Sequence, residues 1–133
     1  RLAMTHSVDK ETIIKKLLRG YGKPIATLEA PEYAAFDPSI KVPYDAAMAT
    51  KLLAASGYSK DKPVKFTIQT TRGFKPKDYE MVQAIVGMWR NVGIEANIET
   101  YEIAKHFELR MSHKLAPAAF YNWGNAIGDP IGL

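Results

Sequence analysis

The sequence predicts an α/β fold: a mainly parallel sheet whose strands are joined by helical crossovers. Two observations predict this class. Between residues 64 and 122 the apolar residues recur every two positions, then every three or four, and the pattern repeats, as in alternating strands and helices. Each interval between predicted strands is also long enough for a helix, and a helix-length crossover makes sequential strands parallel.

Two helices and an irregular segment precede this unit. In "SVDKETIIKKLLRGYGKP" Asp9 can cap the helix, and the glycines and Pro24 end it. Four prolines between Pro24 and Pro43 predict an extended segment across the surface. Asp45 then begins a second helix, and Gly57 in "AASGY" suits a left-handed cap at its end.

The alternating unit gives three strands and two helices. In the first strand Val64, Phe66 and Ile68 alternate with polar residues, which predicts that one face of the sheet is better covered than the other. In the longer helix Trp89 falls on the apolar stripe and is predicted to lie in the core. The predicted strands are 64–71, 95–101 and 116–122, and the predicted helices run from Pro76 to Gly93 and from Ile103 to His113.

Composition is that of one globular domain, predicted to span residues 1–133. The chain has no cysteine, so disulfides and thiolate chemistry are excluded. Its net charge is +4, but 18 basic residues are interspersed with 14 acidic ones, which is typical of solvated helix faces. We therefore expect no nucleic-acid partner.

The sequence offers little for catalysis or metal binding. It has no nucleophile-elbow motif, no His-Glu-x-x-His and no phosphate-binding glycine loop. His106 and His113 lie seven residues apart on one predicted helix, about 10 Å by the helical rise, which is too far for one ion. We expect a protein that is not an enzyme and has no cofactor or metal.

A candidate binding site lies where the strands end. Ligands of open α/β sheets bind beyond the carboxyl ends of the strands, and "FYNWGNAIGDP" follows the third strand. Trp123 could stack on a ligand or pack in the core, Asp129 could bind a ligand or form a turn before proline, and Arg72 could meet a carboxylate or stay solvated. Asn122 and Asn125 could each donate to and accept from a ligand, or could form turns with their own backbone. The candidate ligand-binding residues are Trp123, Asn122, Asn125, Gly124, Asp129 and Arg72.

Four stretches in order resemble a known family. These are "SVDKETIIKKLLRGYGKP", "FDPSIKVPYDAAMATKLLAASGY", "MWRNVGIEANIETYE" and "NWGNAIGDP". Together they resemble the second lobe of the extracytoplasmic solute-binding proteins of the dipeptide, oligopeptide and nickel ABC transporters, over nearly the whole chain. The resemblance implies one lobe of a two-lobed periplasmic binding protein of type II, which closes over a peptide or small molecule and delivers it to a membrane permease.

The resemblance carries further expectations. The chain is expected to be a piece of a longer receptor whose first lobe is missing here, and the receptor to be periplasmic or lipid-anchored outside the cell. Peptide-binding members of the family have an Asp, which pairs with the peptide amine, at the position of Ala126. Either Asp129 takes that role, or the ligand is another solute such as a sugar, opine, polyamine or metal chelate.

Two other classes of protein stay open from the residues alone. One is a small α/β enzyme or nucleotide-binding module, because a fold does not fix a function. The other is a stand-alone interaction domain. A catalytic constellation at the strand ends would identify the enzyme, and the sequence shows none.

Overall fold

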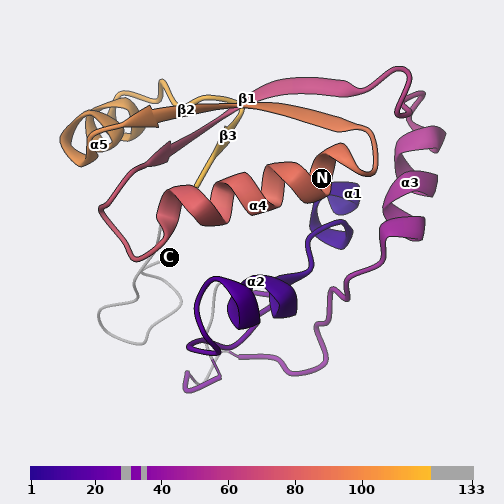
Figure 1. The fold of residues 1–133 in the computed structure, drawn as a ribbon, viewed down its shortest axis with the longest axis horizontal. Coiled ribbons are helices and arrows are strands. Elements are labelled where there is room, and N and C mark those ends of the chain that lie inside the picture. The colour runs from indigo at the N-terminus through magenta and orange to yellow at the C-terminus, as the bar shows by residue number, and fades with distance from the viewer. Residues whose placement is uncertain (28–30, 34–35, 121–133) are drawn as a thin grey trace.

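The computed structural model describes residues 1–27, 31–33 and 36–120. Figure 1 shows a sheet with one long helix lying along it and shorter helices at its two ends. The helices are α1 (Leu2–His6), α2 (Lys10–Lys16), α3 (Ala46–Ala55), α4 (Asp78–Arg90) and α5 (Ile103–Met111), and the strands are β1 (Val64–Thr71), β2 (Ile94–Tyr101) and β3 (Ala118–Ala119). None of the helices in these residues is long and apolar enough to cross a membrane.

The three strands form one parallel sheet in the order β2-β1-β3. The register places Val64 beside Ile94 and Thr71 beside Tyr101, so β1 and β2 end at the same edge. Ile68 of β1 lies beside Ala118 of β3. The predicted parallel sheet is confirmed. The third strand is shorter than predicted within the described residues, and positions 121 and 122 lie outside them.

The core lies between the sheet and α4. Val82, Val86 and Trp89 recur along α4 at helical spacing and pack against Ile68 and Ile94. The Trp89 ring meets Phe66 edge to face, and its Nε1 donates to the carbonyl of Met4 at 3.0 Å. Trp89 is a core residue, as predicted.

The two faces of the sheet are covered unequally, which confirms the expectation from the alternating strands. On β2 the side chains of Glu95, Asn97 and Glu99 are exposed on the face away from α4. On that face α5 covers the carboxyl half of β1, where Gln69 is buried. The sheet is therefore enclosed on both sides only near the ends of its strands.

Local sequence explains most of the helix boundaries. Asp9 accepts from the N–H of Thr12 at 2.9 Å and Asp45 from the N–H of Met48 at 2.8 Å, so both predicted caps are confirmed. Gly57 follows α3 with φ +81°, the left-handed conformation predicted for it. The described residues between α2 and α3 form no helix or strand.

The start of α4 was predicted wrongly. Pro76 was expected to begin this helix, but the helix begins at Asp78, and Lys77 precedes it with φ +62°. The physical reason is that the carboxylate of Asp78 binds the preceding loop, which turns that loop away from helical geometry. The other end is as expected, because Gly93 separates α4 from β2 with φ +100°, and a Cβ there would lie 2.8 Å from the carbonyl carbon of Ser59.

Candidate functional site at the carboxyl edge of the sheet

The site is built on the edge where the parallel strands end. There β1 continues into the loop that begins with Arg72, and β2 ends at Tyr101. Beside them the chain leaves β3 at Phe120, whose N–H donates to the carbonyl of Gln69 at 2.8 Å. The carboxyl ends of the three strands therefore lie close together at this edge, as the sequence predicted.

The first connection is fixed by one carboxylate. Asp78 is 3% exposed, and its oxygens accept five hydrogen bonds from around the loop. The donors are the Thr71 hydroxyl at 2.8 Å and the backbone N–H groups of Gly73 at 2.9 Å, Phe74 at 3.0 Å, Lys75 at 3.2 Å and Tyr79 at 2.8 Å. The loop conformation is set by these bonds.

The electrostatics of Asp78 follow from the same contacts. Burial alone would raise its pKa, because it disfavours the charged form. The hydrogen bonds from Gly73, Lys75, Thr71 and Tyr79 outweigh burial and lower the pKa to about 2. The carboxylate is thus ionised at any physiological pH, and it is already saturated with donors from its own loop.

The loop held by Asp78 presents cations and aromatic rings to solvent. The Arg72 guanidinium lies 4.6 Å from the centre of the Tyr79 ring, and Lys75 Nζ lies 4.7 Å from the centre of the Phe74 ring. Phe74 in turn meets Phe107 of α5 edge to face at 6.4 Å. Phe74 and Phe107 are 41% and 43% exposed, so both rings are available to a ligand.

This arrangement suits a particular kind of ligand. A guanidinium offers several fixed donors to a carboxylate or phosphate, and half-exposed rings offer apolar or stacking area. A solvent-open hollow runs along the loop and the first turn of α4, from Arg72 to Gln83. The edge can therefore bind an anionic group and an adjacent apolar group at once.

Most of the predicted site lies beyond what the structure describes. Trp123, Asn122, Asn125, Gly124 and Asp129 fall outside the described residues, as does Ala126. Arg72 is at the predicted edge and exposed. Of the predicted residues, the structure thus positions Arg72.

Sequence reasoning missed Asp78, Phe74 and Phe107. A signal for Asp78 was present, because "TTRGFKPKD" places a carboxylate directly after a strand, a glycine turn and a proline. Phe107 follows His106 on a helix whose only candidate-site signal in the sequence is its histidine spacing. Pairing with Phe74 depends on tertiary contact, which residue spacing does not give.

The histidine within α5 and the histidine just after it lie in different environments. His106 is 1% exposed and faces Gln69 of β1. His113 is exposed beyond the end of the helix, with φ +56°. In the part of the chain that the structure describes, no three or more His, Cys, Asp or Glu side chains gather into a possible metal site.

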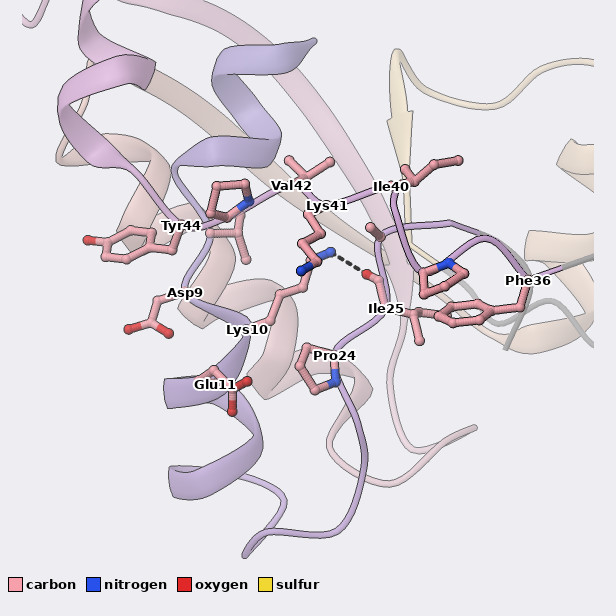
Figure 2. Close-up of a pocket in the computed structure, with 14 residues that line it drawn as sticks. Asp9, Lys10, Glu11, Pro24, Ile25, Phe36, Ile40, Lys41, Val42 and Tyr44 are labelled. Atoms are coloured by element: carbon pink, nitrogen blue, oxygen red, sulfur yellow. Dashed lines mark hydrogen bonds between the residues drawn. The ribbon is translucent and has the colours of Figure 1, made fainter. Parts of the chain in front are cut away.

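A second hollow lies away from this edge, between the start of α2 and the proline-rich segment (Figure 2). Pro24, Ile25 and Phe36 form one side of it, and Lys10 Nζ donates to the Ile25 carbonyl at 2.5 Å, the bond drawn as a dashed line. The lysine is therefore used to hold the segment, and Asp9, which also lines the hollow, is used to cap α2.

Comparison with known proteins identifies the class. The profile for bacterial extracellular solute-binding proteins, family 5 Middle, matches residues 1–133, the whole chain. The chain belongs to this family of solute-binding proteins.

Individual relatives agree with the family match. Heme-binding protein A of Haemophilus influenzae is 30% identical over 132 residues, which are 98% of this chain and 24% of that protein. The dipeptide-binding protein of Escherichia coli is 27% identical, with the same coverage. The chain thus spans about a quarter of the length of these curated relatives.

Solved structures share the fold. The periplasmic binding protein DppA of Helicobacter pylori, in complex with the peptide STSA, superposes with a TM-score of 0.83 at 26% identity, over 98% of this chain and 25% of that one. The dipeptide-binding protein of Pseudoalteromonas sp. SM9913, in complex with Met-Leu, gives 0.83 at 25% identity, over 98% and 26%. The fold is that of the two-lobed periplasmic binding proteins of this family, and the predicted fold class and resemblance are confirmed.

Proposed function

We propose that this chain is part of the second, ligand-binding lobe of the substrate-binding component of an ABC importer for peptides or a related small solute. The observation that carries the proposal is the family match over residues 1–133. Relatives named as dipeptide-binding and di/tripeptide-binding proteins support peptides as the first ligands to test. The partners would be the first lobe of the same protein and a membrane permease.

The described edge supports a ligand that carries a carboxylate beside an apolar group. Arg72 would bind the carboxylate, and Phe74 with Phe107 would contact the apolar part. Trp123, Asn122, Gly124 and Asn125 would complete this wall. The family resemblance implies that Ala126 stands where peptide-binding members have an acid, so a peptide amine would need Asp129 or a group from the other lobe.

The mechanism would be closure of two lobes over the ligand without chemical catalysis. The family is described as extracellular, and we place the receptor in the periplasm or on a lipid anchor outside the membrane. In the closed state the ligand would lie between this edge and the missing lobe, so this chain alone would bind much more weakly than the whole receptor.

The test begins with a thermal-shift screen of the whole receptor against dipeptides, oligopeptides, oligosaccharides, opines and nickel. The ligand that stabilises most is then titrated by calorimetry against two variants. Arg72→Ala should weaken binding of a carboxylate ligand about ten- to a hundredfold, by loss of a charge-assisted hydrogen bond. Arg90→Ala removes an exposed arginine at the other end of α4 and should leave affinity unchanged.

Two results would contradict the proposal. If no solute of these classes raises the melting temperature, the receptor function is wrong. If a carboxylate ligand binds equally well to wild type and Arg72→Ala, the described edge is not where that carboxylate lies.

A further inference from the structure

A buried polar bridge lies under α5, on the sheet face opposite α4. Gln69 and His106 are each 1% exposed, and Gln69 Nε2 lies 3.2 Å from His106 Nδ1. The Oε1 atom of Gln69 accepts from the backbone N–H of Ala116 at 2.8 Å. We call these two side chains with the Ala116 amide the Gln69–His106 bridge.

The bridge holds the segment that leads to the predicted ligand loop. Through its side chain Gln69 binds Ala116, and through its backbone carbonyl it binds the N–H of Phe120 at 2.8 Å. One residue of β1 thus fixes both ends of the stretch 116–120, which contains the short strand β3. The ligand loop predicted from the sequence follows directly after Phe120.

The hydrogen bonds determine the state of the histidine. A backbone N–H can only donate, so the group of Gln69 that faces Ala116 must be its oxygen. The amide nitrogen then faces His106 and donates to Nδ1, which must carry no proton. The bridge is therefore complete only with a neutral imidazole whose proton is on Nε2.

Protonation of His106 is incompatible with this geometry. A charged imidazole carries a proton on both nitrogens, so Nδ1–H would face the N–H groups of Gln69. Either the Gln69 amide turns over and loses Ala116, or the ring moves away from the sheet. The first outcome frees the Ala116 end of the segment, and the second leaves the Gln69 side chain that holds Ala116 without its partner in α5.

The surroundings of His106 favour the neutral form. Burial lowers its pKa first, and the positive charge of Arg110, one turn further along α5, lowers it further. In the described chain β1 meets the ring with the uncharged amide of Gln69, whose oxygen is in turn bonded to the N–H of Ala116. Because the pKa is lowered in the closed bridge, the bridge is stable at neutral pH and weakens as pH falls below the ordinary value of about 6.5.

We propose that Gln69 and His106 are positioning residues for the ligand cleft, and that protonation of His106 loosens residues 116–120 and thereby lowers affinity for the solute. This inference rests on the proposed function. Neither residue needs to touch the ligand, because each acts through the placement of residues 116–120. The expected consequence is capture at neutral pH and weaker retention in acid.

The first measurement tests the bridge without any ligand. Hydrogen exchange of the peptide covering 114–120 is followed in the whole receptor from pH 7.5 to 5.5, corrected for the intrinsic pH dependence of exchange. Opening of this segment should rise by up to tenfold per pH unit while the pH lies between the two pKa values of the closed and open states. In His106→Asn, whose side chain can still accept from Gln69 but cannot titrate, opening should not change with pH.

A matched control separates the bridge from a general effect of acid. His113→Asn removes an exposed histidine seven residues away, and Asn tolerates its positive φ. This variant should keep the wild-type pH dependence. If His106→Asn and wild type show the same dependence, or if His113→Asn abolishes it, the proposal is wrong.

The second measurement tests whether protonation of the Gln69–His106 bridge changes ligand affinity. The Kd of the dipeptide Met-Leu is measured by calorimetry between pH 5.5 and 7.5 for the same three proteins. Affinity should fall in acid by several-fold for wild type and His113→Asn and stay level for His106→Asn. Absence of any Met-Leu binding counts against the proposed peptide ligand, and the exchange experiment still decides the bridge. Equal acid loss of affinity in all three proteins would overturn the link to the cleft.

Discussion

The connection between β1 and α4 and the segment between α2 and α3 are both irregular, yet they are held in opposite ways. The first, Arg72–Lys77, is short, and its backbone N–H groups converge on the single carboxylate of Asp78. The second is far longer, and its described ties are separate: Lys10 holds Ile25, and the His6 ring lies 2.9 Å from the Pro43 carbonyl.

The difference teaches where order in a loop comes from. Backbone polar groups taken out of water must find partners, and a loop is as well defined as those partners make it. The backbone N–H groups around Asp78 share one buried acceptor, so their hydrogen bonds should be lost together. In the long segment each tie is independent, so the loss of one should be local. Among the described residues, the ties of the loop at the candidate site are therefore the more cooperative.

The largest effect is expected from removing the shared acceptor. Asp78→Ala leaves the buried donors of Thr71 and the loop without their partner, and should lower the free energy of unfolding by about 3 to 5 kcal/mol. Urea denaturation of the whole receptor, with Gln83→Ala as the exposed control on the same helix, measures this. A loss of under about 1 kcal/mol would show that the loop does not depend on Asp78.

The next effect is a dependence on acid. The pKa of Asp78 is lowered to about 2 in the folded protein. The contribution of its carboxylate to the free energy of unfolding is therefore fully present above the pKa of the unfolded chain, about 3.9, and is lost as pH falls through 2. That contribution to the free energy of unfolding amounts to about 2 to 3 kcal/mol, from 1.36 kcal/mol per pKa unit. Unfolding measured between pH 5 and 2 should show a steeper loss for wild type than for Asp78→Asn, and parallel curves would contradict the assignment.

A smaller effect is expected at the long segment. Lys10→Met keeps the length of the side chain but removes the hydrogen bond to Ile25, and should cost about 0.5 to 1.5 kcal/mol. Hydrogen exchange should rise around residues 24–27 and stay unchanged in 71–79. If protection is also lost at 71–79, the two regions are coupled and the comparison fails.

The smallest effect is expected from lengthening that segment. Inserting Gly-Ser after Lys23 changes the closure entropy of an already long connection by less than about 0.5 kcal/mol. The same insertion after Phe74 separates the donors from Asp78 and should cost several times more. Melting temperatures of the two insertion variants, compared side by side, check the contrast directly.

Much of the fold was predictable because its signals are local. Periodicity predicted the order of strands and helices. Asp9 and Asp45 marked the starts of two helices as N-cap residues, and the apolar stripe placed Trp89 in the core. Parallel pairing then followed from the length of the crossovers. The carboxyl edge was predictable in the same way, and with it the place of Arg72.

The remainder depends on contacts between distant residues. Gln69 and His106 are 37 positions apart, and nothing in the spacing of either marks them as partners. The start of α4 was missed because Asp78 forms tertiary bonds to its loop where proline alone would favour helix initiation. For Trp123 and the residues around it, the candidate role stays a prediction.

The burial of Trp89 has a practical consequence for spectroscopy. This chain contains two tryptophans. Trp89 is buried in the core, where its ring contacts Phe66 and its Nε1 donates to the Met4 carbonyl. Its fluorescence should therefore be short in wavelength, hard to quench with iodide or acrylamide, and constant while the fold is intact. In this chain, any signal that quenchers reach can then be assigned to Trp123, so Trp89 serves as an internal reference for the second tryptophan.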